Sequence, residues 1–483
     1  MEGLSLLTDF YELTMMQAYY LTERKSGERQ SAAFDMFYRE NPDGNGYAIA
    51  AGLWQAVEYI NGLRFGREDV DYLKSTGAFE DGFLDSLLTF KFTGDVNAIP
   101  EGTVVFPNEP LLTVVAPVME AQLIETALLN IINHQSLIAT KAARIAQAAS
   151  DDVVIEMGLR RAQGPDAGIY GARAAIIGGC AATSNVLAGR MFGVPVRGTH
   201  AHSWIMSFDS EIEAFRMYAK IYPDSCMLLA DTYDTLKSGV PNAIAVFGEM
   251  RGQGFELKNY GIRLDSGDLA YLSKKARRML DGAGFAEAKI SASGDLDEHL
   301  ITDLKNQGAR IDIWGVGTNL ITSKNNPAFG GVYKMAAVSN GGKWEPRIKL
   351  SENPAKVTNP GRKKIHRIYD GATGKIKADL IALSDESYDN GSDLTIFDPF
   401  ATWKRMTLEA GSFTLRELLE PVFIGGACVQ KKRDVMEIRE YSVAERHTLW
   451  DEHKRLTNPH PIPVDLSKPL YDLKQRMIAS IRA

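Results

Sequence analysis

Six short apolar runs decide the fold of this chain: VVIEMG (Val153–Gly158), VPV (Val194–Val196), CMLLA (Cys226–Ala230), YGI (Tyr260–Ile262), AKISA (Ala288–Ala292) and IDIWGV (Ile311–Val316). Each run ends in a few polar or glycine residues, and a segment compatible with a helix follows. Strands that alternate with helices predict a parallel sheet. Because polar and glycine residues gather after every strand, we predict an α/β protein with a β/α barrel and a functional site at the carboxyl ends of its strands.

The composition is that of an ordinary globular protein. The chain has 483 residues, of which 45% are hydrophobic and 24% charged, so its apolar side chains suffice for a large core. The formal net charge of −7 argues against nucleic acid or an anionic membrane as a partner, although it allows a local basic pocket. The basic run at residues 361–364 is expected to be a solvated loop.

Cysteine usage and the N-terminal sequence indicate the compartment. The three cysteines (Cys180, Cys226 and Cys428) lie far apart, which predicts neither a disulfide framework nor a zinc site. The N-terminal stretch carries acidic residues and lacks the basic region of a signal peptide. No apolar run approaches the roughly 18 residues that a membrane span requires. We therefore expect a cytoplasmic protein with no membrane partner.

The segments on either side of the central region predict further domains. Residues 31–40 alternate as a strand, and residues 95–116 are rich in strand signals. From Gly341 to about Val429 turns and β-type runs dominate, and a helical tail follows. We expect an α/β domain at 1–135, the barrel at 136–340, and a β-rich segment with a helical tail at 341–483. The first domain is expected to be discontinuous and completed by part of the C-terminal half.

Two glycine-containing loops follow the last two predicted strands. They are Ser293-Gly294-Asp295 and Gly315-Val316-Gly317-Thr318, and both lead into helices. Glycines let backbone N–H groups approach an oxyanion closely, and the start of a helix favours negative charge. The alternative is that these are turn glycines with no ligand. Two such loops on consecutive late strands favour a phosphate site.

An arginine and two aspartates, Arg263, Asp265 and Asp268, follow the fourth predicted strand within one turn. One interpretation is a surface ion pair with a helix cap at Ser266 or Asp268. The functional interpretation gives Arg263 an anionic substrate group, and gives Asp265 and Asp268 a Mg²⁺ ion or ribose hydroxyls. Asp231 lies in a similar position one strand earlier. Several arginines compensate for these carboxylates, namely Arg160, Arg161, Arg173 and Arg197.

Two of the eight histidines, His200 and His202, lie one residue apart after the second predicted strand. A zinc pair is disfavoured because no further histidine or cysteine lies nearby. They are either rim histidines with structural hydrogen bonds, or one of them is a nucleophile or acid/base near neutral pH. Their spacing does not choose between these roles. A Schiff-base aldolase is disfavoured because the rim motifs contain no lysine.

Six motifs together resemble the nicotinate phosphoribosyltransferase family: LLTDFYELTM (Leu6–Met15), GLRRAQGPD (Gly158–Asp166), RGTHAHSW (Arg197–Trp204), IRLDSGDL (Ile262–Leu269), SGDLDE (Ser293–Glu298) and GVGTNL (Gly315–Leu320). They occur in the family's order. The resemblance implies a type II phosphoribosyltransferase fold, a β/α barrel beside a mixed α/β domain, in a homodimer with shared active sites. The implied reaction joins nicotinate to 5-phosphoribosyl 1-diphosphate and gives nicotinate mononucleotide and diphosphate for NAD salvage. It uses Mg²⁺ and is driven by ATP hydrolysis through a phosphohistidine.

The resemblance also assigns roles to residues. His202 matches the phosphohistidine, whereas the position of His200 varies in the family. Tyr11, Thr199 and Arg263 match positions of the nicotinate site. Asp265 is expected to be catalytic and, with Asp268, to hold Mg²⁺. The other expected substrate contacts are Arg160, Asp231, Ser293, Gly294, Asp295, Gly315, Gly317 and Thr318, the last at a sugar-diphosphate position.

The sequence departs from the family at one position, and it leaves two alternative functions open. Met157 stands where the family usually has an aromatic ring, although a methionine sulfur can also contact a pyridine. A nicotinamide phosphoribosyltransferase is one alternative, since the two bases differ by one charge and an arginine facing the carboxylate decides between them. The other alternative is a non-catalytic metabolite-binding protein on the same barrel, which would be expected to have lost residues of the rim motifs.

Overall fold

The computed structural model describes residues 3–482, which divide into two compact units. The first unit combines the chain up to Leu137 with Ala328–Arg433 and the residues from Tyr441 onward. The second unit contains Ile138–Pro327 and Asp434–Glu440. The chain passes from one unit to the other within α6 (Glu125–Ala149), after Pro327, after Arg433 and within α15 (Val435–His447). No helix among the described residues is both long and apolar enough to cross a membrane.

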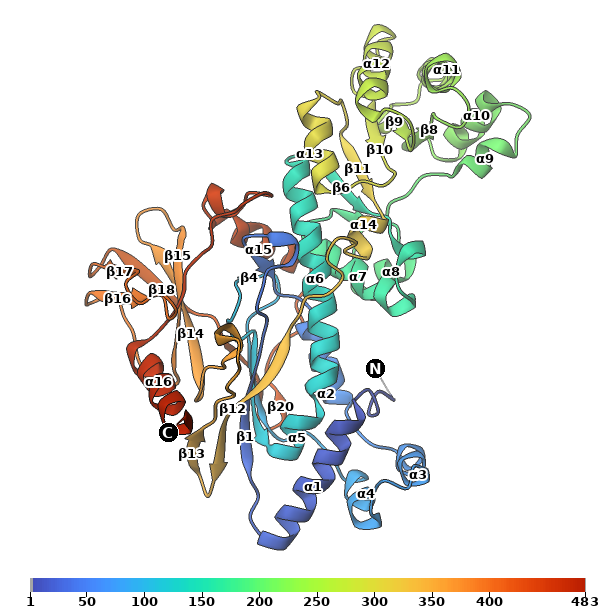
Figure 1. Ribbon diagram of the computed structural model, residues 1–483. Helices are drawn as coiled ribbons and strands as arrows, with labels where there is room; N and C mark the ends of the chain where they lie inside the picture. The colour runs from blue at the N-terminus through green and yellow to red at the C-terminus, as the bar shows by residue number, and fades with distance from the viewer. Residues whose placement is uncertain (1–2, 483) are drawn as a thin grey trace. The chain divides into compact units, whose positions relative to one another are not determined.

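The second unit is built on a parallel sheet of six strands in the order β7-β6-β11-β10-β9-β8 (Figure 1). Its strands are β6 (Val153–Glu156), β7 (Ala182–Thr183), β8 (Ser225–Leu229), β9 (Asn259–Leu264), β10 (Lys289–Ala292) and β11 (Ile313–Val316). All pairs are parallel, and an isolated parallel bridge joins Thr183 to Val196. This is the strand order of a β/α barrel. Among the described residues no ladder joins Val196 to β8, so the barrel is open there.

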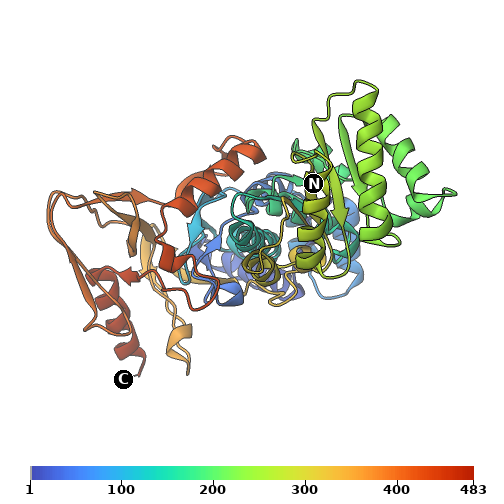
Figure 2. The same cartoon turned by 90° about the horizontal axis from the view of Figure 1, so that it is seen from above.

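Helices follow the strands of this sheet, as Figure 2 shows from above. They are α7 (Pro165–Ile177), α8 (Val186–Phe192), α9 (His202–Met206), α10 (Glu211–Ile221), α11 (Val240–Gly252), α12 (Leu269–Gly282), α13 (Glu298–Asn306) and α14 (Thr318–Ile321). Alternate strand residues such as Ile262, Leu264 and Ile290 are fully buried. Glycine is required at Gly261, because a Cβ atom there would lie 1.9 Å from the carbonyl oxygen of Lys289 on the neighbouring strand.

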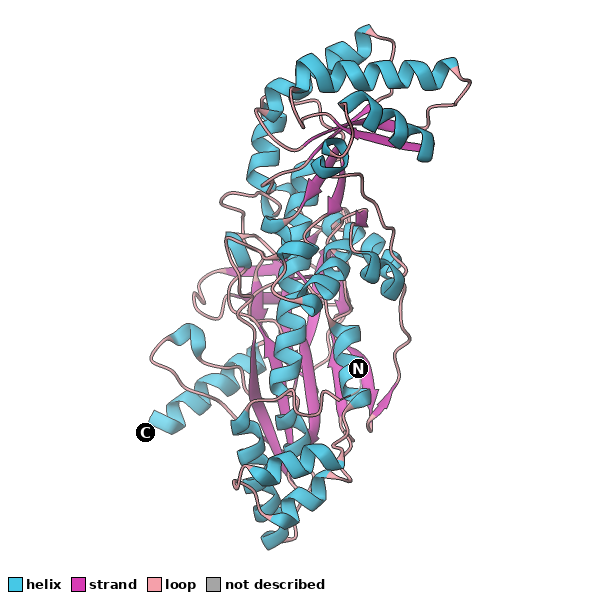
Figure 3. Ribbon diagram, turned by 90° about the vertical axis from the view of Figure 1, so that its right-hand side faces the viewer, coloured by secondary structure: helices cyan, strands magenta, loops and turns pink. Residues whose placement is uncertain are grey.

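The first unit contains an antiparallel sheet in the order β13-β12-β1-β5-β3-β19-β20. Its long strands are among those drawn in magenta in Figure 3. Its strands are β1 (Ser31–Phe37), β3 (Asp95–Ala98), β5 (Leu112–Pro117), β12 (Val332–Asn340), β13 (Lys343–Pro346), β19 (Glu420–Ile424) and β20 (Ala427–Cys428). Strand β1 pairs with β5 on one side and with β12 on the other. The unit is therefore discontinuous, because β12 follows residues 138–327 of the second unit in the chain.

Further elements complete the first unit. Its helices in the N-terminal segment are α1 (Phe10–Ser26), α2 (Leu53–Gly62), α3 (Arg67–Ser75), α4 (Asp81–Leu87) and α5 (Val118–Leu123), and its last helix is α16 (Lys468–Arg482). A second sheet has the order β18-β14-β15-β21, with strands β14 (Lys363–Asp370), β15 (Ile376–Leu383), β18 (Phe413–Glu417) and β21 (Val464–Leu466). Two small pairs are β2 (Ala48–Ile49) with β4 (Val104–Val105), and β16 (Leu394–Phe397) with β17 (Arg405–Leu408).

Candidate active site

Arg263, at the end of β9, ties three rim segments of the second unit together. Its Nε donates to the Ser293 hydroxyl (2.8 Å), after β10, and its Nη1 donates to the Thr199 hydroxyl (3.1 Å). Its Nη2 donates to Oδ1 of Asp265 (2.9 Å). The side chain of Arg263 is only 16% exposed. Because a guanidinium is planar with its donors in a fixed fork, these contacts fix its orientation.

Asp265 is held as a carboxylate in this cluster. Its Oδ1 also accepts a hydrogen bond from the Ser293 hydroxyl. Burial alone would raise the pKa of Asp265, but the Ser293 hydrogen bond and the charge of Arg263 outweigh it and lower the pKa below its usual range. The second oxygen, Oδ2, lies 3.8 Å from Nε2 of His202. A negative charge therefore faces this imidazole at neutral pH.

The spacing of His200 and His202 does not distinguish their roles, but the two side chains differ in exposure and in hydrogen-bond partners. His202 begins α9 with 39% of its side chain exposed, and its Nδ1 lies 3.1 Å from the Thr232 hydroxyl. His200 is buried, and its Nε2 accepts a hydrogen bond from the backbone N–H of Leu229 (3.3 Å). Burial lowers the pKa of His200 to about 4, so this imidazole is neutral at physiological pH. Of the two, only His202 presents an exposed ring next to the carboxylate.

The two remaining aspartates have different environments. Oδ2 of Asp231 accepts hydrogen bonds from the Asp265 backbone N–H (2.9 Å) and the Ser266 hydroxyl (2.6 Å), while its buried Oδ1 has no partner. Asp268 is exposed, and its Oδ1 accepts from the backbone N–H of Tyr271 (2.9 Å), which caps α12. Within residues 3–482 no three His, Cys, Asp or Glu side chains cluster in a way that suits a metal ion. Mg²⁺ is commonly held by one or two carboxylates together with substrate phosphates, so Asp265, with Asp268 as a second carboxylate, still suits it.

The glycine loops lie close to one another at the rim. Ser293 is buried, and Gly294 has a positive φ of 121°, a conformation that favours glycine. The side-chain amide of Asn319, in α14, donates to the carbonyl oxygens of Asp295 (3.0 Å) and Leu296 (3.1 Å). This amide links the Gly315–Thr318 loop to the Ser293–Asp295 loop. At Gly315 a Cβ atom would lie 2.7 Å from the sulfur of Met157, so the side chain of Met157 packs against this loop.

Sequence reasoning missed three residues that support the rim. Asn319 lies inside the GVGTNL motif, and Thr232 directly follows Asp231. Their positions next to predicted site residues are therefore the sequence signal for both. Glu156 is fully buried at the end of β6 and accepts hydrogen bonds from the Gly158 backbone N–H and the Thr183 hydroxyl (2.5 Å). Burial raises its pKa above the usual range. The only sequence signal for Glu156 is a carboxylate at the end of an apolar run.

Arg160 and Tyr11 also lie outside this hydrogen-bonded cluster. Arg160 is exposed in a short 3₁₀ turn (Leu159–Arg161) after β6. Tyr11 belongs to the first unit, where it lies on α1 with 47% exposure. Burial, together with the carboxylates of Glu125 and Glu12, raises the pKa of Tyr11 to about 12, so its hydroxyl keeps its proton.

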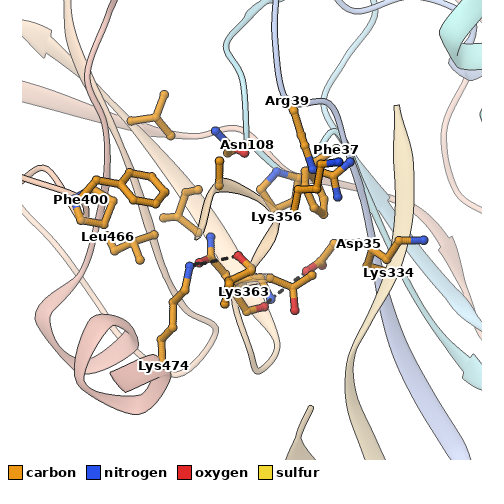
Figure 4. Close-up of a pocket in the computed structure, with 18 of the residues that line it drawn as sticks. Asp35, Phe37, Arg39, Asn108, Lys334, Lys356, Lys363, Phe400, Leu466 and Lys474 are labelled. Atoms are coloured by element: carbon orange, nitrogen blue, oxygen red, sulfur yellow. Dashed lines mark hydrogen bonds and ion pairs between the residues drawn. The ribbon is translucent and has the colours of Figure 1, made fainter. Parts of the chain in front are cut away.

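The first unit also contains a cationic cavity, shown in Figure 4. Its cations are Arg39, Lys334, Lys356, Lys363 and Lys474, and its carboxylate is Asp35. Asp35 is 2.7 Å from Nζ of Lys363 and offsets one of these charges. Burial, and then the charge of Lys363, lower the pKa of Lys474 to about 8. The interpretation of residues 361–364 as a solvated loop is wrong for Lys363, which is buried in β14. The cavity suits a small anion such as a phosphate group.

Comparison with solved structures defines the class of the protein. The crystal structure of human nicotinic acid phosphoribosyltransferase matches with a TM-score of 0.84 at 30% identity, over 97% of this chain and 99% of that one. A structure described as nicotinate-nucleotide pyrophosphorylase from Pyrococcus furiosus shares the fold, with a TM-score of 0.68 at 22% identity over 92% and 95%. The chain is therefore a phosphoribosyltransferase enzyme. Its parallel strands follow the barrel order, and glycine loops, an arginine and a histidine lie at their carboxyl ends.

Sequence relatives narrow this class to one family. The profile of the nicotinate phosphoribosyltransferase N-terminal domain matches residues 6–133, that of the nicotinate phosphoribosyltransferase family 153–372, and that of the C-terminal domain 362–474. Nicotinate phosphoribosyltransferase of Bacillus subtilis is 46% identical over 482 residues, covering 100% of this chain and 96% of the relative. That of Caenorhabditis elegans is 36% identical, covering 96% and 92%. The chain belongs to the nicotinate phosphoribosyltransferase family, as its six motifs predicted.

Proposed function

We propose that this protein joins nicotinate to 5-phosphoribosyl 1-diphosphate, releases nicotinate mononucleotide and diphosphate for NAD salvage, and uses ATP through a phosphohistidine at His202. The observation that carries this proposal is the cluster of Arg263, Asp265 and Ser293 with the exposed ring of His202 beside it. The cluster combines a cation for an anionic base, a fixed carboxylate, and an imidazole accessible to a phosphate group.

Arg263 is the residue that favours nicotinate over nicotinamide. A guanidinium has five N–H donors, and four of those of Arg263 donate to Ser293, Thr199, the His200 carbonyl oxygen and Asp265. One N–H on Nη2 is left for a ligand. Nicotinate carries a carboxylate, which a guanidinium binds more strongly than the neutral amide of nicotinamide. Thr199, fixed against Arg263, and Tyr11, with its protonated hydroxyl, are the other proposed contacts of the base.

The transfer itself requires positioning and charge stabilisation rather than a strong base. The pyridine nitrogen attacks the anomeric carbon of the ribose as the bond to diphosphate breaks, through an oxocarbenium-like state. The backbone N–H groups of the two glycine loops, at Gly294, Asp295, Gly315, Gly317 and Thr318, are proposed to bind the phosphate groups. Arg160 is exposed and adds positive charge, and the half-buried Asp231 is the proposed contact of a ribose hydroxyl.

A divalent cation fits the same rim. We assign Asp265, with Asp268 as the second carboxylate, to hold Mg²⁺. Asp265 is already ionised, and Asp268 uses Oδ1 as a helix cap. When bound, Mg²⁺ neutralises charge on the leaving diphosphate.

The surroundings of His202 support its proposed role as the carrier of a phosphate group. A proton on Nδ1 that is donated to the Thr232 hydroxyl leaves the lone pair on Nε2. Attack of Nε2 on the γ-phosphorus of ATP forms the N–P bond and breaks the bond to the β-phosphate oxygen, so ADP leaves. Water then hydrolyses the phosphohistidine.

We also propose a homodimer in which the first unit of one subunit completes the rim of its partner. Tyr11 and the cationic cavity both belong to the first unit, and they offer a protonated hydroxyl and a lining with more cations than carboxylates. The cavity is suited to phosphate groups of the same substrates. Shared sites would bring both features to ligands bound at the rim.

The test is mononucleotide formation from nicotinate and from nicotinamide, with and without ATP, in the wild type and in His202→Ala. We expect nicotinate to be preferred. The variant should lose ATP hydrolysis and acid-labile phosphate, yet retain slow ATP-independent synthesis with weakened binding of the sugar diphosphate. His299→Ala is a matched control, because His299 is 54% exposed with Nε2 3.9 Å from Glu298, on α13 rather than in the RGTHAHSW motif. Product formation from neither base would overturn the proposed transfer reaction. ATP hydrolysis that persists in step with product in His202→Ala would overturn the proposed phosphohistidine.

A further inference from the structure

The barrel of the second unit has an opening beside the proposed active site. Within residues 3–482, Val196 meets the sheet only through its bridge to Thr183, and β8 pairs with β9 on one side only. Between them the chain runs through residues 197–201. The edge of β8 therefore presents a backbone N–H, that of Leu229, to a segment that is not a strand.

His200 occupies this opening. Its Nε2 accepts the hydrogen bond from the Leu229 N–H (3.3 Å), and its ring packs edge-on against Tyr218 of α10, with centroids 4.6 Å apart. The residue is 9% exposed. The imidazole thus supplies the acceptor that a neighbouring strand would supply in a closed barrel.

The same residue contacts the active-site arginine through its backbone. The His200 carbonyl oxygen accepts from Nη1 of Arg263 (3.4 Å), and the preceding Thr199 hydroxyl accepts from the same nitrogen (3.1 Å). Two residues later His202 begins α9, beside Thr232 in the segment that follows β8. The anchor of the ring on β8 and the contacts on Arg263 therefore belong to one short segment.

We propose that His200 is a positioning residue for nicotinate binding: its imidazole pins residues 199–202 to the edge of β8 and so holds the side chain of Arg263 in its substrate-binding orientation. The role in nicotinate binding rests on the proposed function, but the anchoring of residues 199–202 by the His200 ring does not. The titratable or charged groups that face the ring are Arg263 on β9, His202 on α9 and Tyr218 on α10. None of them is a carboxylate that would favour a protonated His200, and protonation would replace the acceptor on Nε2 with a donor.

Three variants separate the hydrogen bond from the volume of the ring. His200→Leu keeps much of the volume without an acceptor, His200→Gln places an amide oxygen near the position of Nε2, and Tyr218→Phe leaves the acceptor intact. We expect His200→Leu to raise the nicotinate KM about tenfold, as the loss of one hydrogen bond predicts, with a smaller change in kcat. His200→Gln should recover most of this loss, and Tyr218→Phe should resemble the wild type.

A readout independent of activity tests this anchoring. Hydrogen exchange of the 225–230 segment should be faster in His200→Leu than in the wild type and in His200→Gln. In the wild type, ¹⁵N spectra of the ring should show a neutral His200 down to about pH 5. Unchanged KM and exchange in His200→Leu, equal losses in the Leu and Gln variants, or wild-type titration near pH 6.5 would each overturn the inference. A wild type that folds with this protection but makes no mononucleotide would refute the proposed function alone.

Discussion

Arg263→Ala is the substitution with the most direct consequence for the proposed site. It removes the cation paired with Asp265 and leaves Ser293 and Thr199 without a donor. A hydrogen bond to a charged group contributes about 1.5–3 kcal/mol, and loss of a preorganised charged contact typically costs about 10²–10³ in rate. We therefore expect kcat/KM for nicotinate to fall by about 10²–10³, which corresponds to about 3–4 kcal/mol.

Arg263→Lys should recover little of this loss. Lysine keeps the charge, but a single ammonium group cannot reproduce contacts that leave the guanidinium in three directions. We expect less than about a tenfold gain over Arg263→Ala, mostly through KM, in steady-state assays with nicotinate as the varied substrate.

Arg277→Ala is the matched control. Arg277 has an 18% exposed side chain, close to the 16% of Arg263, and donates to Asp281 (2.8 Å) and to the carbonyl oxygens of Phe285 (2.7 Å) and Ala288 (2.5 Å). Ala288 precedes β10, at the opposite end from the rim. The control should lower the melting temperature without changing the nicotinate KM. Arg263→Ala kinetics within twofold of the wild type, or an equal KM change in Arg277→Ala, would refute the reasoning.

Three further predictions concern the dimer, the metal and the second unit's core. Mixing Tyr11→Ala with Arg263→Ala should restore up to about a quarter of the wild-type activity after subunit exchange if the sites are shared, and no recovery would count against sharing. Asp268→Asn should keep the cap of α12, so the melting temperature should not change, whereas the Mg²⁺ concentration needed for half-maximal activity should rise; an unchanged Mg²⁺ dependence would remove Asp268 from the metal site. Glu298→Gln should destabilise the protein by about 3–5 kcal/mol in denaturant titrations, because Glu298 pairs with the buried Lys141 (2.9 Å) and Arg144 (2.9 Å). Burial alone would raise the pKa of Glu298, but its cations lower it below 4.5, so its contribution is present above that pH and is lost as the pH falls through the folded pKa; a difference that persists at lower pH would contradict this assignment.

The positions of the barrel strands show which strands a local sequence pattern can predict. Apolar runs bounded by polar residues are local signals, and β6, β8, β9, β10 and β11 were found where these runs predict them. The VPV run forms only a bridge, because Pro195 has no N–H to donate to a ladder. Strand β7 was missed since its two residues are too short for any periodicity.

Pairing between distant segments is a different case. The alternation of β1 predicts a strand but not its partners, and β12 pairs with it across about 300 residues, as the register of Ser31 with Ser339 records. Such a pairing depends on the path of the whole chain between the two strands, so a local pattern carries no information about it.

By itself the sequence determined the alternating fold class, the family and many of the residues at the rim, because these follow from residue patterns that can be read along the chain. The tertiary structure alone decided which of two histidines one residue apart is exposed beside a carboxylate. His200 and His202 have the same chemistry and nearly the same position, but the first meets the open edge of β8 and the second meets Asp265. It also decided that Asn319 links two loops and that Lys363 is buried next to Asp35. The physical reason is that burial, charge and hydrogen-bond partners come from segments distant in sequence, and these surroundings set what a side chain can do.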